Sequence, residues 1–146
     1  MMLPPARTIL KAVADRTVEF DFTVWQWGDA IAMDGLLDAG ELLGETKYIE
    51  HVERFYRQWM KRELSWQDHL CPGSALLRLH KGNGNQSFLD AGVRLAKLLK
   101  SAPRAKRGGA PMYRPDLGFV RGNVWVDTLY HEPSFLCQLA RLTGEA

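Results

Sequence analysis

Two acidic residues stand beside tryptophans at positions where helices are expected to begin. Asp127 follows Trp125 by two residues, and Asp68 follows Trp66 by the same step. A carboxyl group among apolar neighbours has a raised pKa and can act as a general acid near neutral pH. An Asp in the first turn of a helix also serves as a cap or offsets the helix dipole. Both interpretations stay open at this point, and paired carboxyls with Trp platforms indicate sugar chemistry.

Other common catalytic patterns are missing from the sequence. It contains no Gly-x-Ser-x-Gly and no phosphate loop that ends in Gly-Lys-Ser or Gly-Lys-Thr. Its four histidines form no His-x-x-x-His pair, so a metal site is not expected. The basic run at 104–107 is interpreted as a solvated loop, and a net charge of +2 gives no reason to expect a nucleic-acid partner.

Hydrophobic periodicity predicts an all-α chain, because apolar residues recur at three- and four-residue steps and alternation is nearly absent. The expected helices cover 6–15, 28–43, a segment capped by Thr46 that runs to Trp59, a segment from Pro72 to 81, 86–99, and 125–142 with a kink at Pro133. The stretch 104–123 is rich in Gly, Pro and Arg and is predicted to be a long loop. Such loops are often functional.

A weak internal repeat suggests how these helices are arranged. The run GETKYIE at 44–50 lines up with GNQSFLD at 84–90, and LTGE at 142–145 begins to repeat LLGE at 42–45. A glycine-terminated helix followed by a short turn and an amphipathic helix, repeated along the chain, predicts stacked helical hairpins.

Length and composition fit one domain over residues 1–146. No apolar run approaches the roughly 20 residues that span a bilayer, so no membrane partner is expected. The N-terminus shows no secretory pattern. Cys71 and Cys137 lack CxxC spacing and are expected to be buried, reduced thiols, which favours a cytoplasmic location.

Several motifs resemble, in their order and spacing, those of the unsaturated glycuronyl hydrolases, glycoside hydrolase families 88 and 105. They are WQWGDA at 25–30, LLG at 42–44, Asp68 followed by PGSALLRL at 72–79, APR at 102–104, the paired glycines at 108–109, WVDTLY at 125–130 and LTG at 142–144. The Trp-x-Asp block is the strongest single element. His131 stands where these families usually have Met, and the paired glycines are followed by Ala-Pro.

This resemblance implies a toroid of six helical hairpins, (α/α)6, of which this chain forms about half. It also implies hydration of the C4=C5 enol ether of an unsaturated uronyl oligosaccharide, without metal or cofactor. By position in the motifs, Asp127 matches the acid/base and Asp68 the second acidic residue. The expected substrate-binding residues are Trp125, Trp25, Trp27, Trp66, Tyr113 and His131.

Two other classes remain possible. One is a non-catalytic helical-repeat interaction module, although the repeat here is 40 residues against about 34 in tetratricopeptide arrays. The other is a sugar epimerase on the same toroid, which would rely on several histidines. Because three hairpins are half of a toroid, we expect the N-terminal part of a longer enzyme or an inactive truncated remnant. Such a chain would expose apolar hairpin faces and form a homo-oligomer.

Overall fold

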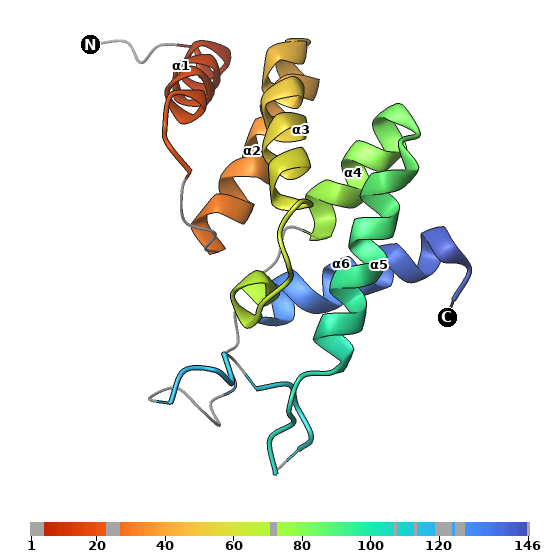
Figure 1. Cartoon of the computed structure of the whole chain (residues 1–146). Coiled ribbons are helices and arrows are strands. Elements are labelled where there is room, and N and C mark those ends of the chain that lie inside the picture. The colour runs from red at the N-terminus through yellow and green to blue at the C-terminus, as the bar shows by residue number, and fades with distance from the viewer. Residues whose placement is uncertain are drawn as a thin grey trace. The chain divides into compact units, whose positions relative to one another are not determined.

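The computed structural model describes residues 5–22, 27–70, 73–106, 108–112, 114–118, 124 and 128–145, without the side chains of 27, 69, 70 and 128–131. In these residues the chain is all-helical, apart from a single β-bridge between Arg104 and Pro111, which confirms the all-α prediction. The elements are α1 (Ala6–Val18), α2 (Trp27–Leu43), α3 (Thr46–Trp59), the 3-10 helix η1 (Trp66–Leu70), α4 (Gly73–Asn83), α5 (Gln86–Lys100) and α6 (Thr128–Thr143) (Figure 1).

The chain divides into two compact units, Met1–Arg62 and Glu63–Ala146. No described helix is both long enough and apolar enough to cross a bilayer. We predict a single domain that forms half of a toroid. The two units are each described by their own packing, so this arrangement stays a prediction.

The first unit is the hairpin of α2 and α3 with α1 packed mainly on α2. Its core consists of buried side chains at helical spacing on both hairpin helices: Met33, Leu36, Leu37, Tyr48, Val52, Tyr56 and Trp59. Gly40 allows the two helices to approach closely near their turn. A Cβ atom at Gly40 would lie 2.7 Å from Cγ1 of Ile49, much closer than atoms in van der Waals contact.

Polar contacts hold α1 to this hairpin. The Arg7 guanidinium donates to the carbonyl oxygens of Leu42 and Leu43, at 2.9 Å each, and thereby satisfies open carbonyls at the end of α2. Asp15 accepts hydrogen bonds from Lys47 and from the Tyr48 hydroxyl, at 2.8 Å for the latter. These contacts lower the pKa of the Asp15 carboxyl far below its usual range.

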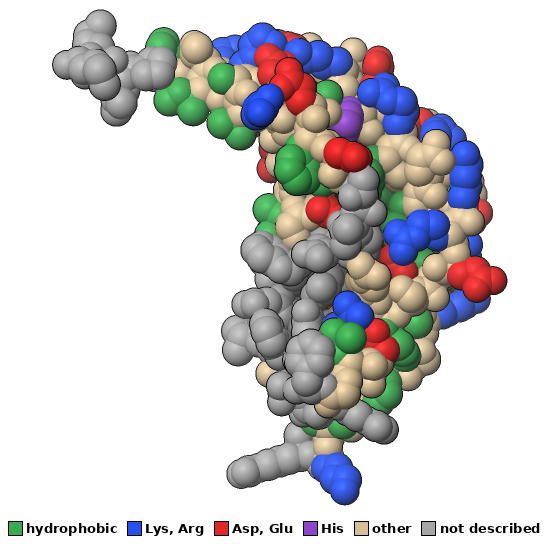
Figure 2. Space-filling model, turned by 60° about the vertical axis from the view of Figure 1, so that its left-hand side comes forward, with side chains coloured by type: hydrophobic (Ala, Val, Ile, Leu, Met, Phe, Trp, Pro, Cys, Tyr) green, Lys and Arg blue, Asp and Glu red, His purple; other side chains and the backbone are tan. Residues whose placement is uncertain are grey.

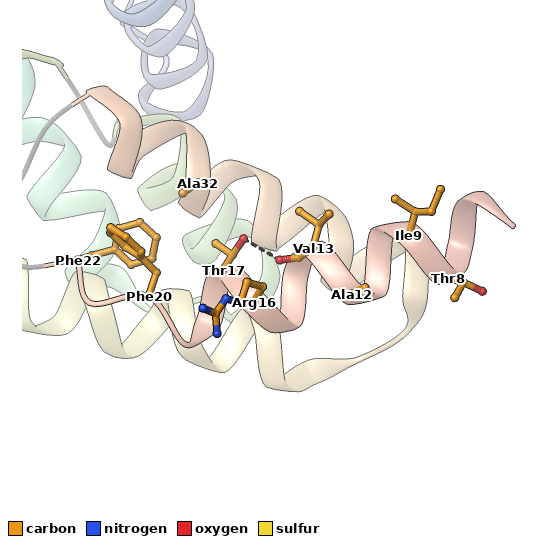
Figure 3. Close-up of a pocket in the computed structure, with 9 residues that line it drawn as sticks. All are labelled: Thr8, Ile9, Ala12, Val13, Arg16, Thr17, Phe20, Phe22 and Ala32. Atoms are coloured by element: carbon orange, nitrogen blue, oxygen red, sulfur yellow. Dashed lines mark hydrogen bonds between the residues drawn. The ribbon is translucent and has the colours of Figure 1, made fainter. Parts of the chain in front are cut away.

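The apolar side of α1 faces solvent instead of the hairpin. Ala14 is the only buried residue of this helix, whereas Ile9 is 44% and Val13 is 58% exposed. Figure 2 shows hydrophobic side chains gathered on the surface along this helix. Together with Phe20 and Phe22 beyond its end, they line an open apolar hollow of about 700 Å³ (Figure 3).

The second unit packs α6 against the hairpin of α4 and α5, and η1 contacts both α5 and α6. Its core is an aliphatic cluster around Phe135: Leu77, Leu95, Leu99 and Leu139. Phe135 lies directly against Gly73, the first residue of α4. A Cβ atom at Gly73 would be 2.3 Å from the Phe135 ring, so this position has room only for glycine.

Three glycines confirm the predicted glycine-ended helices. Gly44, Gly84 and Gly144 follow the ends of α2, α4 and α6, and their φ angles are 71°, 69° and 72°. The amide of Gly44 donates to the carbonyl of Gly40 at 2.9 Å, and that of Gly84 donates to His80 at 2.8 Å. The left-handed conformation that ends each helix strains any residue with a Cβ atom, which explains the recurring glycine.

Some sequence-based expectations were wrong in detail. Thr46 is the first residue of α3, and the cap position belongs to Glu45, whose side chain makes no capping hydrogen bond. Cys137 is exposed instead of buried, and its thiol is free.

The predicted loop contains a turn. The amide of Ala105 donates to the carbonyl of Ala110 at 2.8 Å, so the chain reverses direction through Gly108 and Gly109.

Candidate active site

Asp68 is the fully buried acidic residue of η1, with 0% of its surface exposed. Its Oδ2 atom accepts two hydrogen bonds from Ser65, one from the backbone amide at 2.7 Å and one from the hydroxyl at 3.2 Å. Burial of a carboxyl group is unfavourable unless its oxygens are hydrogen-bonded, and Ser65 meets this need locally. The carboxyl group is therefore held in one fixed orientation.

The reciprocal contacts of Ser65 and Asp68 form a capping box at the start of η1. The Ser65 hydroxyl accepts a hydrogen bond from the amide of Gln67 at 3.3 Å, while Asp68 reaches back to the amide of Ser65. This is the pattern that Ser-x-x-Asp predicts, so the sequence carried a signal for η1 that periodicity alone missed. The helix-start interpretation of Asp68 is thus confirmed, and its catalytic role stays a prediction.

η1 lies against the helix that follows Asp127. The structure places η1 in contact with α6, which begins at Thr128, and Figure 1 shows η1 beside the N-terminal part of that helix. Asp127 itself lies outside the described residues. The second unit therefore contains both the Asp68 segment and the helix that starts one residue after Asp127.

The other predicted site residues are placed only in part. Trp66 is half-buried in η1 of the second unit. Trp27 begins α2 in the first unit, and His131 lies on α6, but their side chains are not described. The remaining three, Trp25, Tyr113 and Trp125, lie outside the described residues.

Glu132 is a second buried acid that the sequence reasoning missed. It lies on α6 and is 6% exposed, and among the described polar and charged residues only Glu132 and Asp68 are buried. Both belong to the second unit, on elements that contact each other. A glutamate before a proline in a helix resembles an ordinary surface residue in sequence, so no pattern identified it.

The described residues contain no group of three or more His, Cys, Asp or Glu side chains that could hold a metal ion. The candidate functional groups in the described part of the second unit are the carboxyl groups of Asp68 and Glu132 and the ring of Trp66. Buried carboxyl groups of this kind serve in proton transfer and in the electrostatic stabilisation of positive charge.

Helical hairpins, glycine-capped helix ends and acids beside tryptophans define the chain as a helical protein with a candidate carbohydrate site. The family model Glycosyl Hydrolase Family 88 matches residues 6–146, and the chain belongs to this family of glycoside hydrolases. No curated protein matches the chain, and no solved structure does.

Proposed function

We propose that this chain carries out the hydration of unsaturated uronyl oligosaccharides. Asp127 donates its proton to C4 of the enol ether, and the positive charge that forms is shared between C5 and the ring oxygen. Water then adds to C5 and returns a proton to Asp127. The C5 hemiketal opens to a ketone, and the hemiacetal left at C1 releases the neighbouring sugar as an alcohol.

The observation that carries this proposal is the Trp-x-Asp block at 125–127 in a chain that the family model matches over 6–146. The position of Asp127 directly before α6 supports it, because α6 contacts the element that holds Asp68. Enol-ether hydration needs a protonated carboxyl group at neutral pH, and a second carboxylate nearby favours protonation of the first. In this proposal Asp68 is that second group, and Trp66 and Trp125 line the pocket.

A cytoplasmic location belongs to the same proposal. The exposed free thiol of Cys137 supports it, because an exposed thiol persists in a reducing compartment. The oligosaccharide would then be taken up before it is degraded.

The experiment measures the loss of ultraviolet absorbance of an unsaturated uronyl disaccharide in the presence of the purified full chain. Asp127→Asn should reduce the rate by roughly 10²- to 10⁴-fold, the usual effect of removing a general acid. Asp68→Asn should also reduce it. Asp90→Asn is the matched control, because Asp90 is an exposed acid on α5 and should leave the rate unchanged. An Asp127→Asn variant with full activity would disprove the assignment.

The second candidate is a non-catalytic interaction module, and the apolar side of α1 favours it. Ile9, Val13 and Phe20 are 44%, 58% and 64% exposed, which is unusual for large apolar side chains that lie together. A wild-type chain without any activity on unsaturated disaccharides, but with a stable fold and a binding partner, would favour this candidate.

A further inference from the structure

We propose that the exposed side of α3 in the first unit is a second saccharide-binding site, selective for oligosaccharides that carry uronate carboxylates. The site consists of two adjoining hollows, here called the α3 groove. The first hollow, of about 240 Å³, is lined by Phe20, Asp21, Phe22, His51, Arg54, Phe55 and Gln58. The second, of about 440 Å³, is lined by Arg54, Arg57, Gln58, Met60 and Lys61. The two share Arg54 and Gln58, so these side chains border both hollows on α3.

Aromatic rings form one end of the α3 groove. Phe20 and Phe22 have ring centroids 4.9 Å apart, and Phe22 lies 6.2 Å from Phe55 in an edge-to-face arrangement. Figure 3 shows the Phe20 and Phe22 side chains next to each other just beyond the end of α1. Phe20 is 64% exposed, so one of its faces is open to a ligand. The rings meet edge to face, at 61° and 80°, so the platform for an apolar sugar face is the exposed Phe20 ring alone.

Arg54 provides the charge for a carboxylate. Among the described residues, its guanidinium takes part in neither a hydrogen bond nor an ion pair, whereas the neighbouring Arg57 donates to Glu53 at 3.0 Å. A guanidinium binds a carboxylate through two parallel hydrogen bonds, which an ammonium group cannot do. Arg54 is therefore a guanidinium in the α3 groove that is available for an anionic ligand. Lys61, whose Nζ donates to Gln58 Oε1 at 3.2 Å, adds a second positive charge there.

His51 and Asp21 point to a sugar as the carrier of that carboxylate. Burial and the nearby charge of Arg54 lower the pKa of His51, so its ring is neutral at pH 7 and both donates and accepts a hydrogen bond. The Asp21 carboxylate accepts hydrogen bonds from hydroxyl groups, which a sugar ring offers on several carbons. A ligand with hydroxyl groups for His51 and Asp21 and a carboxylate for Arg54 has the chemistry of a uronate sugar.

The choice of a saccharide over other hydroxylated acids rests on the proposed function. The test therefore distinguishes failure of the α3 groove from failure of the proposed function. The probe is saturated trigalacturonate, which lacks the C4=C5 double bond and cannot be hydrated. Its binding to the full chain is followed by calorimetry and by chemical-shift changes, with neutral galactotriose as the comparison ligand. Trigalacturonate should bind and galactotriose should bind at least tenfold more weakly.

Arg54→Gln should weaken trigalacturonate binding by about tenfold or more, since a hydrogen bond to a charged group typically contributes that factor. Phe20→Ala should weaken both saccharides, because it removes the platform. Arg141→Gln, an exposed arginine on α6 of the second unit, is the charge-matched control and should not change binding.

Equal loss with Arg54→Gln and Arg141→Gln would show non-specific charge attraction and overturn the proposal. Absence of trigalacturonate binding would also overturn the proposal. Binding of single-stranded RNA through Arg54, instead of trigalacturonate, would overturn it too. Trigalacturonate binding without hydration of the unsaturated disaccharide would refute the proposed function and leave the α3 groove standing. Hydration of the unsaturated disaccharide without trigalacturonate binding would refute the α3 groove and leave the proposed function standing.

Discussion

Replacement of Gly73 by alanine tests the packing of the second unit at its tightest point. A Cβ atom there would lie 2.3 Å from Cγ and Cδ2 of Phe135 and 2.7 Å from Cε2. Carbon atoms in contact are separated by about 3.5–4.0 Å, so the ring would have to move by more than 1 Å. Phe135 is fully buried, and Leu77 and Leu139 belong to the cluster around it, so the ring has no free space to enter.

The expected loss of stability follows from these distances. Overpacking of a tight core costs about 1–3 kcal/mol, and complete loss of a buried Phe side chain costs about 3–5 kcal/mol, which sets the upper limit. The smaller backbone entropy of unfolded alanine offsets about 0.4–1 kcal/mol of this. We therefore expect Gly73→Ala to lower the free energy of unfolding by about 1–3 kcal/mol.

The assay is urea unfolding followed by far-ultraviolet circular dichroism. Gly82→Ala is the matched control, because Gly82 lies on the same helix and its Cβ atom would meet nothing within 4 Å. This control should be neutral or stabilising by up to about 1 kcal/mol. Phe135→Leu removes the ring that the new methyl group meets, so the double variant with Gly73→Ala should be more stable than the sum of the single effects predicts. Additive effects, or a Gly73→Ala variant as stable as Gly82→Ala, would refute the close packing.

Two further predictions concern α1. Hydrogen bonds from Lys47, Tyr48 and other groups hold the pKa of Asp15 below its unfolded value, so Asp15 stabilises the fold at neutral pH, and this contribution declines as pH falls below about 4. Thermal melts should therefore show that Asp15→Asn destabilises the chain clearly less at pH 2 than at pH 7; an equal difference at both would contradict the linkage. The exposed apolar side of α1 should cause concentration-dependent self-association in sedimentation experiments, and Val13→Glu should weaken it at least tenfold, because burial of a Val contributes about 1.5–3 kcal/mol. A wild-type chain that is monomeric at every concentration would rule this out.

The helices were predictable from sequence because their cores are regular. On α3 the buried residues Val52, Tyr56 and Trp59 follow the three- and four-residue steps that periodicity detects, and on α5 Phe88 and Leu95 do the same. The repeat of glycine-ended helices was also visible, since a left-handed residue at a helix end leaves a glycine in the sequence.

The orientation of α1 could not be read in this way. Ile9 and Val13 form an apolar face of the kind that normally packs inward, yet the helix is attached through Arg7 and Asp15 on its other side. Periodicity identifies an apolar face but carries no information on what covers it. A five-residue helix such as η1 is too short for periodicity to detect, and its capping box is the signal that marks it.

Glycine in the motif that follows Asp68 has a packing reason that the sequence alone hides. Gly73 is required because Phe135, 62 residues further along the chain, occupies the space of its side chain. The start of α4 and the middle of α6 are thereby fixed against each other, and η1 contacts α6 as well. This motif glycine thus helps to set the distance between the segments that carry the candidate acids.

The hydrogen bonds of Asp68 bear on how two carboxyl groups would divide the proposed reaction. Its Oδ2 atom accepts hydrogen bonds from both the amide and the hydroxyl of Ser65, so this oxygen is held in a fixed position. In the proposed mechanism the proton donor is Asp127, because it stands in the Trp-x-Asp block, and the fixed Asp68 carboxyl stabilises the positive charge that develops at C5. Replacement of Ser65 by alanine should then reduce the catalytic rate without abolishing it, whereas Asp127→Asn removes the proton itself.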